Sequence, residues 1–231
     1  MKNVKSYIKF VKENLQNTNK TIYVLVGPPS VGKSTWIKQT FIDVDPYTIN
    51  RDEIVEQVAK TYGWTYDDLY VSPLPEQVEG DVSEKYGTVV KSPEYMTWQP
   101  LSYSKVMEAN GKVGELFSKK VSEAKGQENI VVDMTNMNAG SRVGALKAIE
   151  GVENEYRKVA VVFNFKGAEE IIKKVALKRA EEAKIEGKSK TIPPEAFDRM
   201  FKSFQEISPE EGFDEVVNVD NTEKLKQVIT E

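Results

Sequence analysis

Apolar and polar residues alternate in blocks along the chain, and the blocks predict alternating strands and helices. Five short runs, rich in β-branched and apolar residues, have the length of buried strands; they are 21–26, 46–50, 129–133, 159–163 and 216–219. The intervening stretches predict helices at about 35–41, 52–62, 101–125, 141–150, 168–186, 194–207 and 222–230. Strands that alternate with helices favour an α/β fold with a parallel sheet and helices on both faces.

The pattern is less regular in three places. Residues 1–19 have the spacing of an amphipathic helix, which either packs on the domain or presents its lysines to nucleic acid. Residues 62–100 are rich in aromatic residues and proline, and we interpret them as an insertion whose aromatics form a small core, with base stacking as the alternative. Within 101–125, Gly111 and Gly114 predict a kink or a break in the helix.

Composition limits the chemistry more than the fold. The 231 residues suit one domain over 1–231, or at most two small ones, and 39% hydrophobic with 29% charged residues can form a core and a solvated surface. The chain has no cysteine and no histidine, so acid–base chemistry near neutral pH must use carboxylates or lysine. The net charge of −4 means that nucleic-acid binding would need a local basic patch. Without an apolar run of membrane-spanning length, we expect a soluble cytoplasmic protein.

The clearest motif lies between the first predicted strand and its helix. Residues 27–34 read GPPSVGKS and fit the phosphate-binding P-loop pattern. The two glycines allow the backbone to turn its N–H groups toward an anion, and the helix that follows directs its positive end there. We expect Lys33 to reach the β- and γ-phosphates of ATP, and Ser34 to bind Mg²⁺. The predicted nucleotide-binding residues are Gly27, Ser30, Gly32, Lys33, Ser34 and Thr35.

Two carboxylates stand where predicted strands end. Asp52 follows the strand 46–50, and Asp133 ends the strand 129–133. Ligands of open α/β sheets bind at the carboxyl ends of the strands, so both residues are active-site candidates, with Asp133 near the metal. Asp52 could instead be an ordinary first-turn residue of a helix, and Asp133 a turn former.

A basic segment follows the fourth predicted strand. Residues 168–192 combine a highly charged helix, which contains Arg179, with the basic loop Gly187–Lys190. P-loop kinases place a phosphate-closing lid after this strand, so we interpret 168–192 as a helical lid. The alternative is a solvated helix face with no catalytic role.

Four blocks of the sequence resemble the phage-type polynucleotide 5′-kinase domain and its relatives among small P-loop kinases. They are GPPSVGKSTW (27–36), INRDE (49–53), VVDMTNMNAGSR (131–142) and KTIPPEAFDRMFKSF (190–204). The resemblance implies a P-loop NTPase three-layer sandwich with a mainly parallel five-stranded sheet and a helical lid. It also implies transfer of the γ-phosphate of ATP, with Mg²⁺, to the 5′-hydroxyl end of DNA or RNA.

The resemblance further implies roles for individual residues. Asp52 would be the general base, and Arg179, with Lys188 or Lys190, would be a lid cation that closes on the transferring phosphoryl group. Asp133 would support Mg²⁺ or line the acceptor side. The remaining acceptor-binding residues implied are Arg51, Thr135 and Arg142.

Two rival functions remain open. A kinase of the same fold could phosphorylate a small molecule, such as a nucleotide or, in the manner of zeta-type toxins, a nucleotide-sugar. The acidic net charge favours that function, as does Val55, which stands where the polynucleotide kinases have a substrate-binding arginine. The second rival is a nucleotide-dependent switch without transfer activity, which needs Lys33 and Ser34 but no general base.

Overall fold

The computed structural model describes residues 20–70, 103–149, 156–185 and 191–230. Contacts divide the chain into two compact units, and each is described by itself. The first unit comprises 1–50, 119–181 and 192–231, and the second comprises 51–118 and 182–191. The predicted amphipathic helix at 1–19 and most of the predicted insertion, from 71 on, lie outside the described residues. A single domain over 1–231 stays a prediction.

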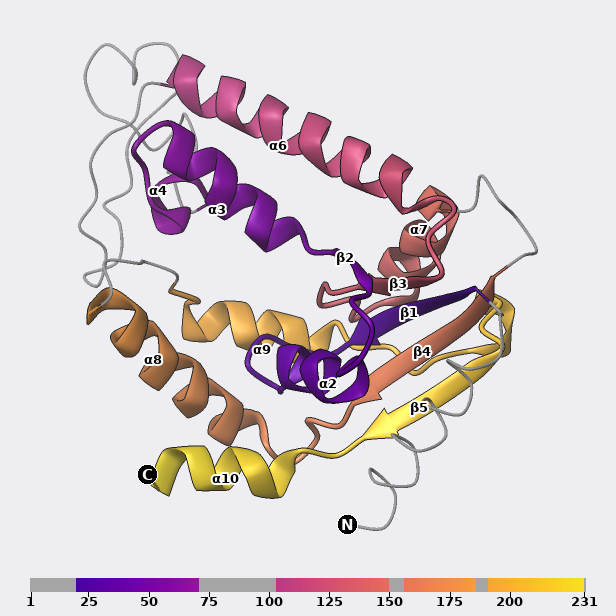
Figure 1. Ribbon diagram of the computed structural model, residues 1–231. Helices are drawn as coiled ribbons and strands as arrows, with labels where there is room; N and C mark the ends of the chain where they lie inside the picture. Colours follow the sequence, from indigo (N-terminus) through magenta and orange to yellow (C-terminus); the bar gives the residue numbers. More distant parts are fainter. Residues whose placement is uncertain (1–19, 71–102, 150–155, 186–190, 231) are drawn as a thin grey trace. The chain divides into compact units, whose positions relative to one another are not determined.

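The first unit is built on one sheet whose strands are all parallel and ordered β2-β3-β1-β4-β5 (Figure 1). The strands are β1 (Thr21–Val26), β2 (Tyr47–Ile49), β3 (Asn129–Val132), β4 (Arg157–Phe163) and β5 (Glu215–Val219). The helices of this unit are α2 (Lys33–Thr40), α7 (Ala139–Ile149), α9 (Pro194–Lys202) and α10 (Thr222–Thr230), with the 3₁₀ turn η2 (Pro209–Glu211). The end of α6 (Tyr103–Ala124) and most of α8 (Glu169–Ile185) also belong to it. The predicted fold class, a P-loop NTPase sandwich on a parallel five-stranded sheet, is confirmed.

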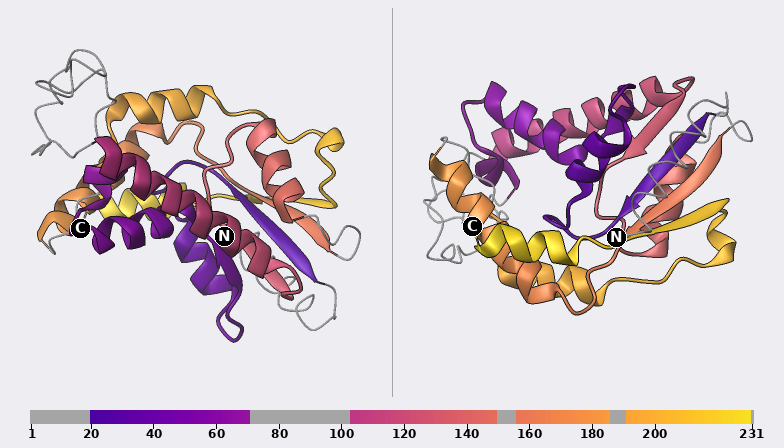
Figure 2. Two further views of the ribbon diagram at one scale, coloured as in Figure 1. Left: turned by 90° about the horizontal axis from the view of Figure 1, so that it is seen from above. Right: turned by 60° about the horizontal axis from the view of Figure 1, so that its bottom comes forward.

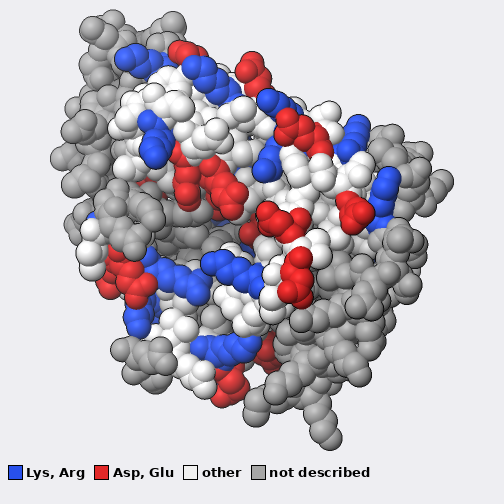
Figure 3. Space-filling view, viewed as in Figure 1, with Lys and Arg blue, Asp and Glu red and all other residues white. Residues whose placement is uncertain are grey.

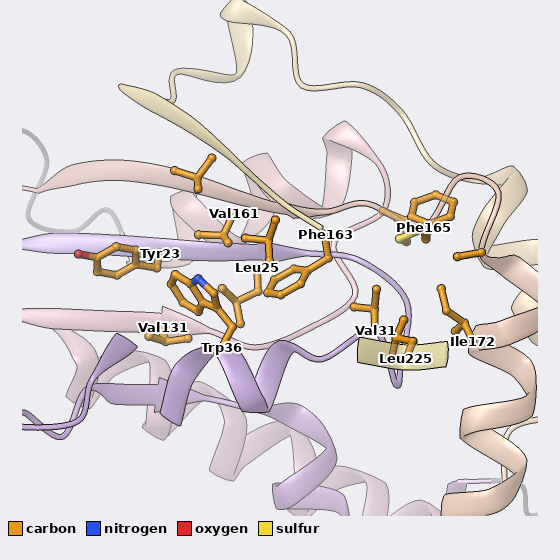
Figure 4. Close-up of a cluster of buried hydrophobic side chains, with 14 of the residues drawn as sticks. Tyr23, Leu25, Val31, Trp36, Val131, Val161, Phe163, Phe165, Ile172 and Leu225 are labelled. Carbon is orange, nitrogen blue, oxygen red and sulfur yellow. The ribbon is translucent and has the colours of Figure 1, made fainter. Parts of the chain in front are cut away.

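Alternation along the strands buries both faces of the sheet. Tyr23 and Leu25 of β1 join a core cluster with Trp36 of α2 on one face (Figure 4). The residues that alternate with them, Ile22 and Val24, are also fully buried and point to the other face of the sheet, and α7 contacts β1 as well. Continuous apolar strands are typical of a parallel sheet covered on both sides.

The strand order reverses at β1, so the P-loop, which follows β1, lies at the switch point of the sheet. β1 pairs with β3 on one side and β4 on the other, so the connections after β1 and β3 leave the sheet in opposite directions (Figure 2). The register pairs Val24 with Val132, and Val132 with Ile49. The loops that follow β1, β2 and β3 therefore begin at the same edge, which is where such sheets bind ligands.

The second unit is helical. It contains α3 (Arg51–Thr61), α4 (Tyr66–Tyr70), the first part of α6 (Tyr103–Ala124) and the last part of α8 (Glu169–Ile185). The break predicted at Gly111 or Gly114 is wrong, because α6 is one continuous helix. Ala109 and Val113 on either side of Gly111 are buried with residues of α3 and α4, and this packing outweighs the low helix propensity of glycine.

The aromatics at the start of the predicted insertion belong to the same small core. Tyr66 and Leu69 are buried in it, and Tyr62 and Trp64 stack on each other with ring centroids 4.7 Å apart. For residues 62–70 this agrees with a local core. No helix in the described ranges has the length and apolarity to cross a membrane.

Candidate functional site

The P-loop leaves β1 through a glycine that allows close packing. A Cβ at Gly27 would lie 3.0 Å from Phe163 Cβ and 3.2 Å from Val31 Cγ1. A larger residue would therefore push the loop away from β4. The absence of a side chain at Gly27 lets the backbone start its turn directly against the core.

Gly32 is required for a different reason. It has φ 102° in the left-handed region and forms the N-cap of α2. A Cβ there would lie 2.6 Å from Nδ2 of Asn221, and that nitrogen donates a hydrogen bond to the carbonyl of Val31 over 3.1 Å. Asn221, which follows β5, thus fixes the backbone of the P-loop through this hydrogen bond. Since Gly32 has no side chain to cap α2, the N–H groups of its first turn can serve an anion.

The remaining P-loop residues face the same turn. Lys33 donates hydrogen bonds from Nζ to the carbonyls of Gly27, over 2.9 Å, and Pro28, over 3.2 Å. Ser34 and Thr35 are exposed in the first turn of α2. The structure therefore brings the predicted lysine and both hydroxyls to the amino end of one helix, at the carboxyl edge of the sheet.

The loop between β3 and α7 is bonded to the start of the P-loop. The N–H of Gly27 donates to the carbonyl of Thr135 over 2.9 Å, and Nδ2 of Asn136 donates to the carbonyl of Leu25 over 2.8 Å. Asn136 is buried and has φ 46°, a conformation that asparagine tolerates better than most residues. Residues 133–138, here named the β3 loop, are thus hydrogen-bonded to the end of β1 and the start of the P-loop.

Asp133 is held at the same edge by the end of β2. Its N–H donates to the carbonyl of Ile49 over 2.9 Å, and its Oδ2 accepts a hydrogen bond from Nδ2 of Asn50 over 3.3 Å. Asn50 is the first residue of the Asn-Arg-Asp block. The block therefore has a structural partner in Asp133, independent of what Asp52 does.

The structure gives Arg142 a different place from the one expected. Its side chain has 0% exposure, and its guanidinium is bound by Glu211 at 2.6 and 2.7 Å. Arg142 is thus closed to an acceptor in this structure. A buried carboxylate and backbone carbonyls take up its hydrogen bonds, and this arrangement does not favour the predicted role of a substrate-binding arginine.

Arg179 shares a cavity with the P-loop helix. The cavity has a volume of about 140 Å³ and is lined by residues of α2, α8, the end of β5 and α10. Both polar and apolar side chains line it. The lining residues are Gly32, Thr35, Trp36, Gln39, Arg179, Val219, Asn221, Lys224, Leu225 and Val228.

Other cations of α8 have partners within the first unit. Lys173 pairs with Asp198 at 2.7 Å and with Glu170 at 2.9 Å, and the hydrogen bond to Asp198 is the main cause that raises the pKa of Lys173. Lys178 donates to the carbonyl of Val228 over 2.8 Å. For these two lysines the structure favours a structural role. The predicted lid cations Lys188 and Lys190 lie outside the described residues.

The second unit carries the remaining candidates. Arg51 and Asp52 open α3, and Oδ1 of Asp52 accepts a hydrogen bond from the hydroxyl of Tyr66 over 3.1 Å. Val55, one turn further along α3, is buried in the small core with 3% exposure. Arg51 is exposed. Tyr66 therefore fixes one oxygen of the predicted base.

Five residues of this arrangement were not found by sequence reasoning: Asn50, Tyr66, Asn136, Glu211 and Asn221. Asn50 and Asn136 could have been found, since both lie in blocks that follow strands at the ligand-binding edge. Tyr66, Glu211 and Asn221 lie outside those blocks, and the sequence gives no local signal for their contacts.

No curated protein matches the chain significantly. Among solved structures, it is similar to a protein from Chloroflexus aurantiacus J-10-fl that is provisionally described as a kinase, with 11% identity over 93% of this chain and 94% of the other, at a TM-score of 0.48. A structure of the PezAT toxin–antitoxin system from Streptococcus pneumoniae shows 14% identity over 93% of this chain and 78% of the other, at a TM-score of 0.47.

The family comparison is more informative than either structure. A model of the family AAA_33, described as an AAA domain, matches residues 22–207. The match begins in β1 and includes the P-loop, the Asn-Arg-Asp block, the β3 loop and α8. The chain therefore belongs to this AAA-domain family of P-loop, kinase-like proteins.

Proposed function

We propose that this protein is an ATP-dependent phosphotransferase that transfers the γ-phosphate to the 5′-hydroxyl of a polynucleotide. The observation that carries the phosphoryl-transfer part is the bonding of the P-loop to the β3 loop, which begins with Asp133. Lys33, Ser34 and Asp133 all stand at the carboxyl edge of the sheet, within the family match. The polynucleotide part rests on the resemblance of the Asn50–Asp52 block.

The residues present fit a magnesium ion held jointly with nucleotide phosphates. Among the described residues no cluster of three or more histidines, cysteines and carboxylates could hold a metal on its own. Ser34 and Asp133 offer a hydroxyl and a carboxylate at the sheet edge, and Mg²⁺ is usually bound by one or two such oxygens together with phosphates and water. When bound, the ion would neutralise charge on the transferring phosphoryl group.

The proposed mechanism assigns one task to each of the chain's groups. The first-turn N–H groups of α2 and the ammonium of Lys33 bind the phosphates and stabilise charge on their oxygens in the transition state. Lys33 must first give up its hydrogen bonds to Gly27 and Pro28. Thr35 and Arg179, the lid cation that the resemblance implies, both line the cavity beside α2, and we assign both to the bound nucleotide.

The acceptor side is assigned to the start of α3. The carboxylate of Asp52 accepts the proton of the acceptor hydroxyl while the new O–P bond forms. The bond from the γ-phosphorus to the bridging oxygen breaks, and ADP leaves with that electron pair. The hydroxyl of Tyr66 donates a hydrogen bond to Oδ1 of Asp52 and so orients this carboxylate. Arg51 would bind the phosphate that follows the acceptor sugar.

A second candidate function is phosphorylation of a small hydroxyl compound, and the position of Val55 favours it. The substrate-binding arginine of polynucleotide kinases would stand there, but Val55 is packed in the core of the second unit. Along α6, acidic and basic side chains alternate and pair with one another, so this helix forms no basic track (Figure 3). A short acceptor needs no such track.

Transfer of label from γ-labelled ATP to a panel of acceptors tests both candidates. The panel contains a 5′-hydroxyl oligonucleotide, nucleosides, nucleotides and nucleotide-sugars. A polymer acceptor should bind more weakly as salt rises, whereas a small neutral one should not. Asp52→Asn should abolish transfer and keep ADP binding, and Lys33→Ala should reduce both. Intact ADP binding with no transfer to any acceptor would favour the switch.

A further inference from the structure

The strongest unassigned feature is the buried pair of Arg142 in α7 and Glu211 in η2. The side chains have 0% and 4% exposure, and the carboxylate meets the guanidinium at Nε over 2.6 Å and at Nη2 over 2.7 Å. A charge buried to this degree destabilises the fold unless it is paired and hydrogen-bonded. The two groups lie 69 residues apart in sequence, so the pair ties two distant segments together.

All five N–H donors of Arg142 have an acceptor. Two serve Glu211, as described. Nη1 donates to the carbonyl of Asn136 over 3.2 Å and to that of Met137 over 3.1 Å, and Nη2 also donates to the carbonyl of Glu206 over 3.3 Å. A guanidinium has five donors, so none is left for a substrate. The side chain thus binds Glu211, the backbone of the β3 loop and the carbonyl of Glu206 at the same time.

The same loop is fastened on its other side to the P-loop. The N–H of Gly27 donates to Thr135, and the side chain of Asn136 donates to Leu25. The carbonyl and the amide of Asn136 thus point to opposite sides, one toward Arg142 and the other toward β1. The β3 loop is therefore the connection between the buried pair and the P-loop.

Glu211 is itself held in place. Its Oε1 accepts the N–H of Ser208 over 3.0 Å, within a capping box that opens η2. The neighbouring Gln205 binds the β3 loop twice: its N–H donates to the carbonyl of Met137 over 2.8 Å, and its Oε1 accepts the N–H of Ala139 over 2.9 Å. The segment from Gln205 to Glu211, here named the support segment, thus binds the β3 loop at several points.

We propose that Arg142 and Glu211 are positioning residues that hold Asp133 and Thr135 in register with the P-loop. Only the catalytic consequence of this proposal depends on the proposed phosphoryl transfer. Buried ion pairs can often be replaced by apolar residues of similar volume with little loss of stability, so stability alone does not call for a pair here. The backbone carbonyls of the β3 loop, in contrast, can be bound by a guanidinium and not by an apolar side chain.

The test compares the double variant Arg142→Met/Glu211→Leu with the conservative single variant Glu211→Gln. A matched control is Lys166→Gln, which removes the exposed ion pair of Lys166 with Glu206 on the same support segment. Three quantities are measured for each: the thermal midpoint, hydrogen exchange at the N–H of Gly27, and kcat and KM for transfer. Exchange at Gly27 is read without any substrate.

For the double variant we expect a folded protein in which exchange at Gly27 is faster on the order of tenfold or more. We expect kcat to fall on the order of 10- to 100-fold, because a displaced group costs about that much, with KM for ATP changed far less. Glu211→Gln keeps the shape and part of the hydrogen bonding, so it should lie between the wild type and the double variant. Lys166→Gln should match the wild type.

The readouts separate two failures. If the wild type transfers no phosphate, the proposed function fails, yet faster exchange at Gly27 in the double variant would still support the positioning role. If a folded double variant keeps wild-type exchange and wild-type kcat, the pair does not position the β3 loop and the inference is overturned. If the double variant does not fold, exchange and kcat of Glu211→Gln decide, and wild-type values for both would overturn it.

Discussion

The sheet edge of the first unit and the helix α6 of the second unit contain the same kinds of residues under opposite conditions. At the edge, Arg142 and Glu211 are paired out of contact with water, while on α6 Glu108 and Lys112 pair at 2.9 Å with exposures of 57% and 49%. Gly32 is locked in the left-handed region against Asn221, whereas Gly111 sits in a regular helix with no atom near its missing Cβ. The comparison shows that the position of a charged residue or a glycine in the fold, and not its residue type, decides how much it contributes to stability.

The largest expected effect comes from breaking the buried pair on one side. Glu211→Ala leaves the guanidinium of Arg142 buried without its carboxylate, and this should lower the free energy of unfolding by about 3–5 kcal/mol. Glu108→Ala removes an exposed carboxylate of α6 and should leave the midpoint of urea denaturation nearly unchanged. Equal shifts for the two variants would remove the distinction between the regions.

Next in size is a methyl group at Gly32. Gly32→Ala places a Cβ in a strained backbone conformation and 2.6 Å from Asn221 Nδ2, so the protein should lose about 1–3 kcal/mol of stability. Binding of Mg·ADP, followed by calorimetry, should weaken as well, since the turn that presents the N–H groups must shift. Wild-type stability and wild-type ADP affinity in this variant would contradict the role given to Asn221.

The stability of the protein should depend on pH through the buried Glu211 more than through the exposed Glu108. The hydrogen bond from Arg142 is the main cause that holds the pKa of Glu211 below its ordinary value of 4.5. The unfolded chain therefore binds a proton first as pH falls, and the stability that this group contributes, complete above its ordinary pKa, is lost as pH falls toward its folded pKa. Urea midpoints measured between pH 7 and pH 3 should show a shallower decline for Glu211→Gln than for the wild type.

Glu108 provides the control for that experiment. Its pKa is also lowered, chiefly by the hydrogen bond from Lys112, but the pair is open to solvent and salt. Glu108→Gln should retain the steep acid-side decline. If Glu108→Gln flattened the curve and Glu211→Gln did not, the assignment of the decline to the buried pair would be wrong.

The smallest effect should be a gain. Gly111→Ala adds a methyl group in open space within a regular helix, and it should raise the free energy of unfolding by about 0.5–1 kcal/mol. Chemical denaturation of Gly111→Ala and Gly114→Ala measures it, since both positions are alike in α6. A loss of stability at both would mean that α6 needs flexibility there.

The sequence was sufficient to predict those strands and helices that depend on the local pattern of residues. The run Thr21–Val26 and the P-loop motif specify β1 and the entry into α2, because alternating burial and glycine chemistry act within a few residues. Glu211, in contrast, pairs with Arg142 across 69 residues, and the sequence contains no sign of that pairing. The helix α6 shows the same limit, since burial of Ala109 and Val113 outweighs what Gly111 predicts locally.

For the candidate site, the sequence predicted that the P-loop and Asp133 lie at the carboxyl edge of the sheet. It did not reveal the contacts that hold them there. Asp133 depends on Asn50, and the P-loop depends on Asn221, through contacts that only the folded sheet creates. The roles of Asp52 and Arg51 stay predictions, since both belong to the second unit.

The most direct test of the central claim is transfer of label from γ-labelled ATP to a matched pair of oligonucleotides, one with a 5′-hydroxyl and one with a 5′-phosphate. We expect label on the 5′-hydroxyl strand only, with loss of transfer in Asp52→Asn and retained binding of ADP by that variant. Absence of transfer by a wild-type protein that binds ADP would contradict the polynucleotide acceptor. Transfer that persists in Asp52→Asn would contradict the assigned base.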